Sequence, residues 1–136
     1  MEKSREVLEL TTRIGEVLLK NGGEIFRVQQ TMQMIAKAYG IKNFHVYVLA
    51  NGIFVSIEEN GYEMRKQIQT ESPELEIASQ IRYVPLSSVH LGRVAAVNNL
   101  SREIVAQKYT VAQAWERIEQ IEKIPFTSNA LQVLFS

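Results

Sequence analysis

The sequence predicts an α+β fold with two layers, in which an N-terminal helix hairpin and two C-terminal helices cover an antiparallel sheet of three to four strands. Apolar residues recur every three or four positions over residues 5–20, 24–39 and 89–107 and again after residue 110, which is the spacing of one helix face. Between the helix pairs, over residues 44–49 and 53–57, apolar residues occupy alternate positions, as they do in strands. Because helices and strands are segregated along the chain, the pattern favours one α+β domain.

The first two helices are expected to form an antiparallel hairpin. Ser4 is the expected N-cap of the first helix, and Gly40 is the expected stop of the second. The run Asn21-Gly22-Gly23 separates the helices, and glycine adopts a positive φ without a Cβ clash. The two predicted apolar faces comprise Val7, Leu10, Ile14, Val17 and Leu18, and Ile25, Val28, Met32, Ile35 and Tyr39.

Glu24 and Arg27 open the second predicted helix. Opposite charges three residues apart on a helix are neighbours, and a carboxylate suits the positive end of the helix dipole. This charged pair is either part of the architecture of the bend or the floor of a binding site.

The strands are expected to follow one another as hairpins. Asn51-Gly52 is a type I′ turn signal between the first two, and Asn60-Gly61 precedes a more polar third strand over residues 62–69. After a turn at residues 70–73, a fourth strand is predicted to end at Pro85.

The third predicted helix is apolar on two faces, which indicates a central position. Ser87 or Ser88 is its expected cap, and Asn98 and Arg102 fall on the first of the two faces. A buried guanidinium needs acceptors, so Arg102 either pairs with a glutamate to lock the packing or lines a polar pocket. The two faces comprise Leu91, Val94, Ala95 and Val105, and Val97, Leu100 and Ile104.

The last predicted helix starts at a capping box of Thr110 and Gln113 and ends before Pro125. The chain therefore divides into a domain of residues 1–125 and an apolar tail of residues 126–136, which carries no charge. The tail is either a segment that packs on the domain or the start of a membrane helix that continues beyond it. The apolar face predicted for the last helix comprises Val111, Ala114, Trp115, Ile118 and Ile121.

Composition excludes several classes of site. The chain has no cysteine and no aspartate, which excludes disulfides, thiolate metal sites and a Ser-His-Asp triad within it. Its two histidines, His45 and His90, do not have metal-ligand spacing, so no metal site and no cofactor are expected. The net charge of zero gives no reason to expect nucleic acid as a partner.

Three separated stretches resemble the signature blocks of the threonine/serine exporter family in sequence, order and spacing. They are NGGEIFRV at residues 21–28, ANGIFVS at residues 50–56 and VAAVNNLSR at residues 94–102. The resemblance implies a cytoplasmic N-terminal domain at the cell membrane, followed by a bundle of transmembrane helices. It also implies that residues 126–136 begin the first of those helices.

The same resemblance implies the efflux of small hydroxylated amino acids and a role for this domain in assembly, gating or substrate sensing. The expected partners are the transmembrane portion of the same transporter or a partner subunit, with L-threonine or L-serine as a ligand and homo-oligomerisation left open. The candidate substrate-binding residues are Glu24, Arg27, Asn98 and Arg102. Asn98 and Arg102 would hold the carboxylate of an amino acid, and Glu24 would hold its ammonium group.

Two other function classes stay open at this point. A hydrolase or peptidase would use Ser87 or Ser88 with His90, although no spacing indicates an orienting group or an oxyanion hole. We therefore assign no catalytic residue and favour a domain that is not an enzyme. A stand-alone module that binds another protein is the remaining alternative.

Overall fold

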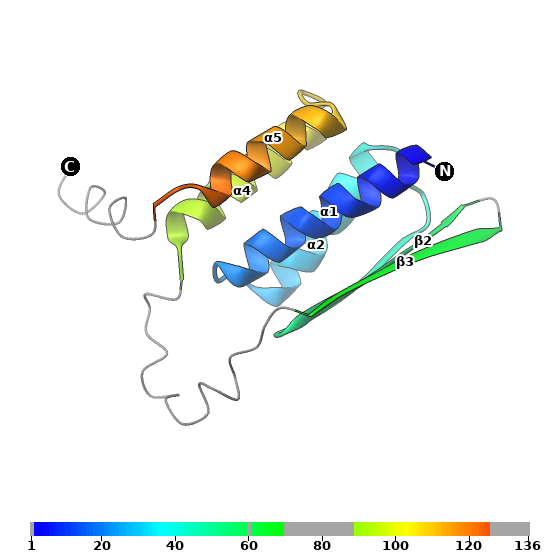
Figure 1. Cartoon of the computed structure of the whole chain (residues 1–136), viewed down its shortest axis with the longest axis horizontal. Coiled ribbons are helices and arrows are strands. Elements are labelled where there is room, and N and C mark those ends of the chain that lie inside the picture. Colours follow the sequence, from blue (N-terminus) through cyan, green and yellow to red (C-terminus); the bar gives the residue numbers. More distant parts are fainter. Residues whose placement is uncertain (1, 60, 70–88, 126–136) are drawn as a thin grey trace.

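The computed structural model describes residues 2–59, 61–69 and 89–125. Within these ranges, two helices precede an antiparallel three-stranded sheet in the sequence and two helices follow it, as predicted (Figure 1). The elements are α1 (Glu2–Lys20), α2 (Ile25–Ala38), β1 (Phe44–Leu49), β2 (Gly52–Glu59), β3 (Tyr62–Gln69), α4 (Leu91–Val105) and α5 (Val111–Glu122). The predicted α+β class, with its N-terminal helix hairpin and its two C-terminal helices, is confirmed.

The glycine bend ends α1 as predicted. Gly22 adopts a φ of 99°. Its amide donates to the carbonyl of Leu19 at 3.2 Å, and the amide of Gly23 donates to Leu18 at 2.8 Å, which is the Schellman pattern. A Cβ on Gly23 would lie 2.7 Å from the Leu18 carbonyl oxygen, so the tight turn requires glycine at this position.

The predicted N-cap of α1 is wrong. The helix begins at Glu2, which places Ser4 inside its first turn. The hydroxyl of Ser4 is buried and donates to the carboxylate of Glu59 at the end of β2. Ser4 therefore ties α1 to the sheet, because a tertiary acceptor is within reach of its hydroxyl.

The strand order is β1-β2-β3, with antiparallel pairing throughout. The predicted turn between β1 and β2 is displaced by one residue. Leu49 pairs with Gly52, so the loop is Ala50-Asn51 and Gly52 is the first residue of β2. Gly52 also pairs with Gln69 of β3, which holds it in the sheet instead of the turn. The predicted fourth strand lies outside the described residues.

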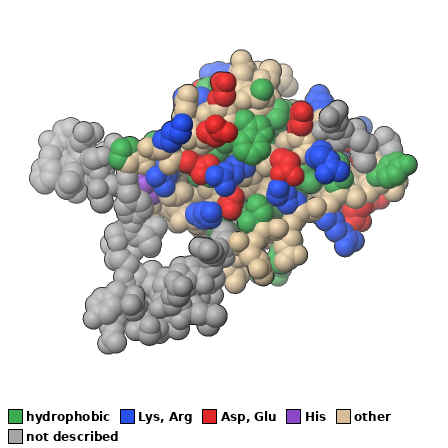
Figure 2. Space-filling view, viewed as in Figure 1, with side chains coloured by type: hydrophobic (Ala, Val, Ile, Leu, Met, Phe, Trp, Pro, Cys, Tyr) green, Lys and Arg blue, Asp and Glu red, His purple; other side chains and the backbone are tan. Residues whose placement is uncertain are grey.

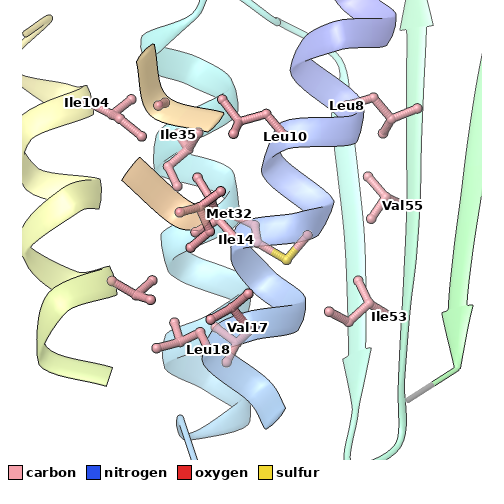
Figure 3. Packing of buried hydrophobic residues seen from close by; sticks show 14 of the residues in the cluster. Leu8, Leu10, Ile14, Val17, Leu18, Met32, Ile35, Ile53, Val55 and Ile104 are labelled. Carbon is pink, nitrogen blue, oxygen red and sulfur yellow. The ribbon is translucent and has the colours of Figure 1, made fainter. Parts of the chain in front are cut away.

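All the described helices lie on one side of the sheet. Helices α1 and α2 lie against the sheet, and α4 and α5 pack on the side of α1 and α2 away from it (Figure 1). Side chains of α1 therefore point both ways. In Figure 3, Leu8 faces Val55 of β2, whereas Leu10 lies toward Ile35 and Ile104 of the other helices.

The orientation of α4 differs from the prediction. Its second predicted face is buried against the other helices, but its first face is open to solvent, with Leu91 74% exposed and Val105 41% exposed. Arg102 lies on that open face and is itself exposed. Among the described residues it has no glutamate partner and lines no buried pocket, and solvent satisfies its guanidinium. The apolar residues of the buried face are Val97, Leu100 and Ile104.

The last helix agrees with its sequence signals. Thr110 and Gln113 form the predicted capping box, and α5 ends at Glu122, before Pro125. The guanidinium of Arg13 on α1 binds both carboxylate oxygens of Glu122, which fastens the first helix to the last. In the described ranges, no helix is long and apolar enough to cross a bilayer. The predicted domain boundary and the tail at residues 126–136 lie at and beyond the end of these ranges.

Candidate functional site

The four predicted substrate-binding residues lie on α4 and at the start of α2. Glu24 is the N-cap residue of α2, although its side chain makes no capping hydrogen bond. Glu24, Arg27 and Arg102 are exposed, and Asn98 is half-buried. Within the described residues, no hydrogen bond or ion pair involves the side chain of Glu24, Arg27 or Arg102.

The structure brings part of this set together. Helices α2 and α4 pack side by side. The amide of His90 donates to the carbonyl of Asn21 at 3.0 Å, so the start of α4 lies at the glycine bend. With a rise of about 1.5 Å per residue, Asn98 lies about 12 Å along α4 from His90 and Arg102 lies about 18 Å along it. Glu24 and Arg27 are therefore near the start of α4, whereas Arg102 is near its far end.

A hydrogen bond at the other ends of the same two helices fixes their parallel arrangement. The hydroxyl of Tyr39, after α2, donates to the carbonyl of Tyr109, after α4, at 3.2 Å. Burial raises the pKa of the Tyr39 hydroxyl, since the phenolate would lose solvation there. The helix pair α2 and α4 is thus held by hydrogen bonds at both ends.

None of the four predicted residues lines either of two shallow hollows on the surface. One hollow, of about 450 Å³, lies on the outer face of the sheet against His45, Tyr47, Phe54 and Arg65. The other, of about 560 Å³, lies beside Gly40. In the part of the chain that the structure describes, no three carboxylate or imidazole groups gather closely enough to hold a metal ion.

A buried polar cluster, which sequence reasoning missed, lies where the described chain ends. We name it the polar junction: Asn21 in the bend, His90 and Arg93 on α4, and the carbonyl groups of Ile124 and Pro125. Asn21 is 7% exposed and His90 is 3% exposed. The junction therefore joins the α1–α2 bend, the start of α4 and the end of α5, with Asn21 and His90 buried and Arg93 half-buried.

His90 holds two of these parts with opposite sides of its ring. Its Nδ1 accepts a hydrogen bond from the amide of Arg93 at 3.1 Å, which caps the N-terminus of α4. Its Nε2 lies 2.8 Å from the carbonyl oxygen of Pro125. Because Nδ1 accepts, the ring proton must be on Nε2, which then donates to Pro125. His90 is the N-cap in place of the predicted Ser87 or Ser88, which lie outside the described residues.

Arg93 completes the junction with its guanidinium. Its Nε and Nη2 donate to the carbonyl of Ile124 at 3.2 and 2.8 Å, and its Nη1 donates to Oδ1 of Asn21 at 3.3 Å. The side-chain Nδ2 of Asn21 in turn donates to the carbonyl of Val17 at 2.7 Å, at the end of α1. One planar cation thus connects the bend with the last described residues.

The geometry of His90 also argues against the hydrolase alternative. A general base needs a ring nitrogen that can accept a proton from the nucleophile. The lone pair of Nδ1 is engaged by the amide of Arg93, and Nε2 carries the proton donated to Pro125. His90 therefore acts as a structural cap in this structure.

Charge is evenly distributed on the face shown in Figure 2. Acidic and basic side chains alternate over it, in keeping with the net charge of zero. Even distribution gives no field that would draw a strongly charged partner to this face.

Comparisons with known proteins match this chain to one family. The family model described as "Putative threonine/serine exporter" matches residues 9–136. A relative from Mycobacterium tuberculosis (strain ATCC 25618 / H37Rv), named "Probable threonine/serine exporter", is 28% identical over 122 residues, which is 90% of this chain. The chain spans only 21% of that relative's length. No solved structure matches significantly.

Proposed function

Because this chain belongs to the threonine/serine exporter family, we propose that residues 1–125 form the cytoplasmic domain of an exporter of threonine, serine or a similar small amino acid. Residues 126–136 then begin its first transmembrane helix. The relative's greater length supports this proposal, since the match accounts for only 21% of that protein. The absence of charged residues from positions 126–136 supports it as well.

The polar junction carries the proposed role, which is assembly or gating. The carbonyl groups of Ile124 and Pro125, the last two described residues, accept hydrogen bonds in the junction. Arg93 and His90 bind these groups to α4, and Arg93 also binds Asn21 in the bend. A displacement of the following segment would therefore move three helices together, because buried polar contacts do not stretch without loss.

An efflux measurement tests this role in the full-length protein. We expect Arg93→Ala to lower the initial rate of L-threonine efflux several-fold while the amount of protein in the membrane stays the same. The matched control is Arg117→Ala, because Arg117 is exposed on α5 and its guanidinium donates to Gln120 of the same helix. Equal efflux from the Arg93→Ala and Arg117→Ala proteins would contradict a role for the junction.

Substrate sensing is the narrower form of the proposal. Helices α2 and α4 pack side by side, with Glu24 and Arg27 near the start of the pair and Asn98 and Arg102 farther along α4. An amino acid could place its ammonium group on Glu24 and its carboxylate on Asn98, with the guanidinium groups nearby. Calorimetric titration with millimolar L-threonine should give binding heat that Glu24→Gln abolishes. No heat with the unaltered chain would eliminate sensing and leave assembly or gating.

A further inference from the structure

The two most exposed large apolar side chains in the described part of the molecule lie at the same end. Leu91, the first residue of α4, is 74% exposed, and Phe26, in the first turn of α2, is 70% exposed. Ile25 and Leu49 are partly exposed beside the same bend and at the end of β1. We name these four residues the apolar end of the domain.

The arrangement of the elements places these residues together. Helices α2 and α4 both start at the glycine bend, because Val89 packs on Gly22 and His90 bonds to Asn21. Strand β1 lies antiparallel to α2, so the last residue of β1 is near the start of α2 and the glycine bend. Figure 1 shows the bend, the start of α4 and the end of the described chain on one side, and the β2–β3 turn on the opposite side.

The path of the chain distinguishes this end from the other. Pro125 is held at the junction between the bend and α4, so the apolar residues 126–136 follow from the apolar end. Three basic side chains are exposed near this end: Lys20 at the end of α1, Arg27 in the first turn of α2 and Lys123 after α5. Lys20 also pairs with Glu16 on its own helix at 3.3 Å. Glu24 is an exposed acid among them. Apolar side chains beside Lys and Arg are typical of surfaces that lie in the lipid headgroup region.

We propose that the apolar end rests on a phospholipid bilayer, with Phe26 and Leu91 inserted between the headgroups. This inference rests on the proposed function, because it places the domain against the membrane that the following segment would enter. Inserting one such side chain should strengthen vesicle binding about tenfold. The basic side chains add an attraction to anionic lipids that weakens with salt.

The chain contains no cysteine, which allows single labels to test this orientation. Phe26→Cys, Leu91→Cys and Tyr62→Cys would each carry an environment-sensitive fluorophore. Tyr62 is the matched control, because it is 66% exposed but lies at the opposite end, beside the β2–β3 turn. The probe is a vesicle of phosphatidylcholine and phosphatidylglycerol in equal parts, with or without a quencher attached to the lipid chains.

We expect blue-shifted emission and quenching by lipid at positions 26 and 91 and no change at position 62. Binding of the unlabelled chain should weaken about a hundredfold in Phe26→Ser/Leu91→Ser, which removes both side chains, and stay unchanged in Tyr62→Ser. An unchanged signal at positions 26 and 91, or equal changes at all three positions, would overturn the proposal. So would equal vesicle binding by the double variant and the control, because the tail would then account for the binding.

A protein partner in place of lipid would give a different result. In the reconstituted full-length protein, labels at positions 26 and 91 would then be shielded from water but not quenched by lipid, which overturns lipid contact. The vesicle assay needs no transport, so its failure is distinguishable from failure of the proposed function. Lipid contact without any effect of Arg93→Ala on efflux would overturn only the proposed function.

Discussion

The Nε2 atom of His90 lies 2.8 Å from the carbonyl oxygen of Pro125, across 35 positions of sequence. The same ring caps α4 through Nδ1, so one side chain binds both the start of α4 and the backbone at Pro125. Arg93 adds three hydrogen bonds from the next turn. The end of the described chain is therefore fixed to the body of the domain by specific polar contacts.

Substitutions of His90 should separate its two contacts. His90→Ala removes both the cap and the bond to Pro125, and it should lower the free energy of unfolding by about 2 kcal/mol. His90→Asn keeps a good capping side chain but cannot reach Pro125, and it should cost about 1 kcal/mol. Urea unfolding of both proteins measures the difference. An equal loss in the two variants would show that the cap contributes nothing.

The exposed charges at the bend should matter little for stability. Glu24 and Arg27 make no ion pair in the described structure, so Glu24→Ala should change the free energy of unfolding by less than about 1 kcal/mol. Arg102→Ala should behave in the same way, because its guanidinium is in solvent. Thermal melts measure both. A loss of about 3 kcal/mol or more in either variant would instead reveal a buried charge network.

Gln107 is the one residue other than glycine with a positive φ, 61°, in the described ranges. It occupies the C′ position after α4, where its amide donates to Ile104 at 2.9 Å and glycine is usual. Gln107→Gly should therefore raise the free energy of unfolding by about 0.5–1 kcal/mol. Gln107→Ala, which keeps the strained conformation, is the control and should give no such gain in the same denaturation experiment.

Two adjacent threonines in α1 should respond in opposite directions to valine. Both are fully buried, but the hydroxyl of Thr12 donates to the carbonyl of Leu8 at 2.6 Å, whereas that of Thr11 has no partner among the described residues. Thr11→Val should stabilise the domain by about 1 kcal/mol, because it removes an unsatisfied buried hydroxyl. Thr12→Val should be neutral or destabilising by up to about 1 kcal/mol. Stabilisation of both variants to the same extent would contradict this assignment.

Periodicity and local turn chemistry were sufficient to predict the elements. The glycine bend, the stop at Gly40 and the Thr110 capping box depend only on neighbouring residues, and all three are present. Ser4 and Asn51-Gly52 were misread because distant partners decide their roles. Ser4 bonds to Glu59, and Gly52 is held by pairing with Gln69 on the third strand.

The candidate site was harder to predict for a related reason. The sequence predicts a buried Arg102 because α4 is apolar on two faces, and only the packing of α1, α2 and α5 decides which face is covered. Sequence reasoning did not single out Arg93 and considered His90 only as a general base, because their acceptors are backbone carbonyls 31 and 35 residues away. Backbone acceptors leave no trace in side-chain patterns, so a buried junction of this kind cannot be read from sequence.

Efflux by the full-length protein with and without residues 1–125 tests the central claim most directly. Cells that lack their own threonine exporters would be loaded with labelled L-threonine, and the two proteins would be compared at equal amounts in the membrane. The account predicts rapid efflux with the intact protein and near-background efflux when residues 1–125 are deleted. Equal efflux from both proteins would contradict it.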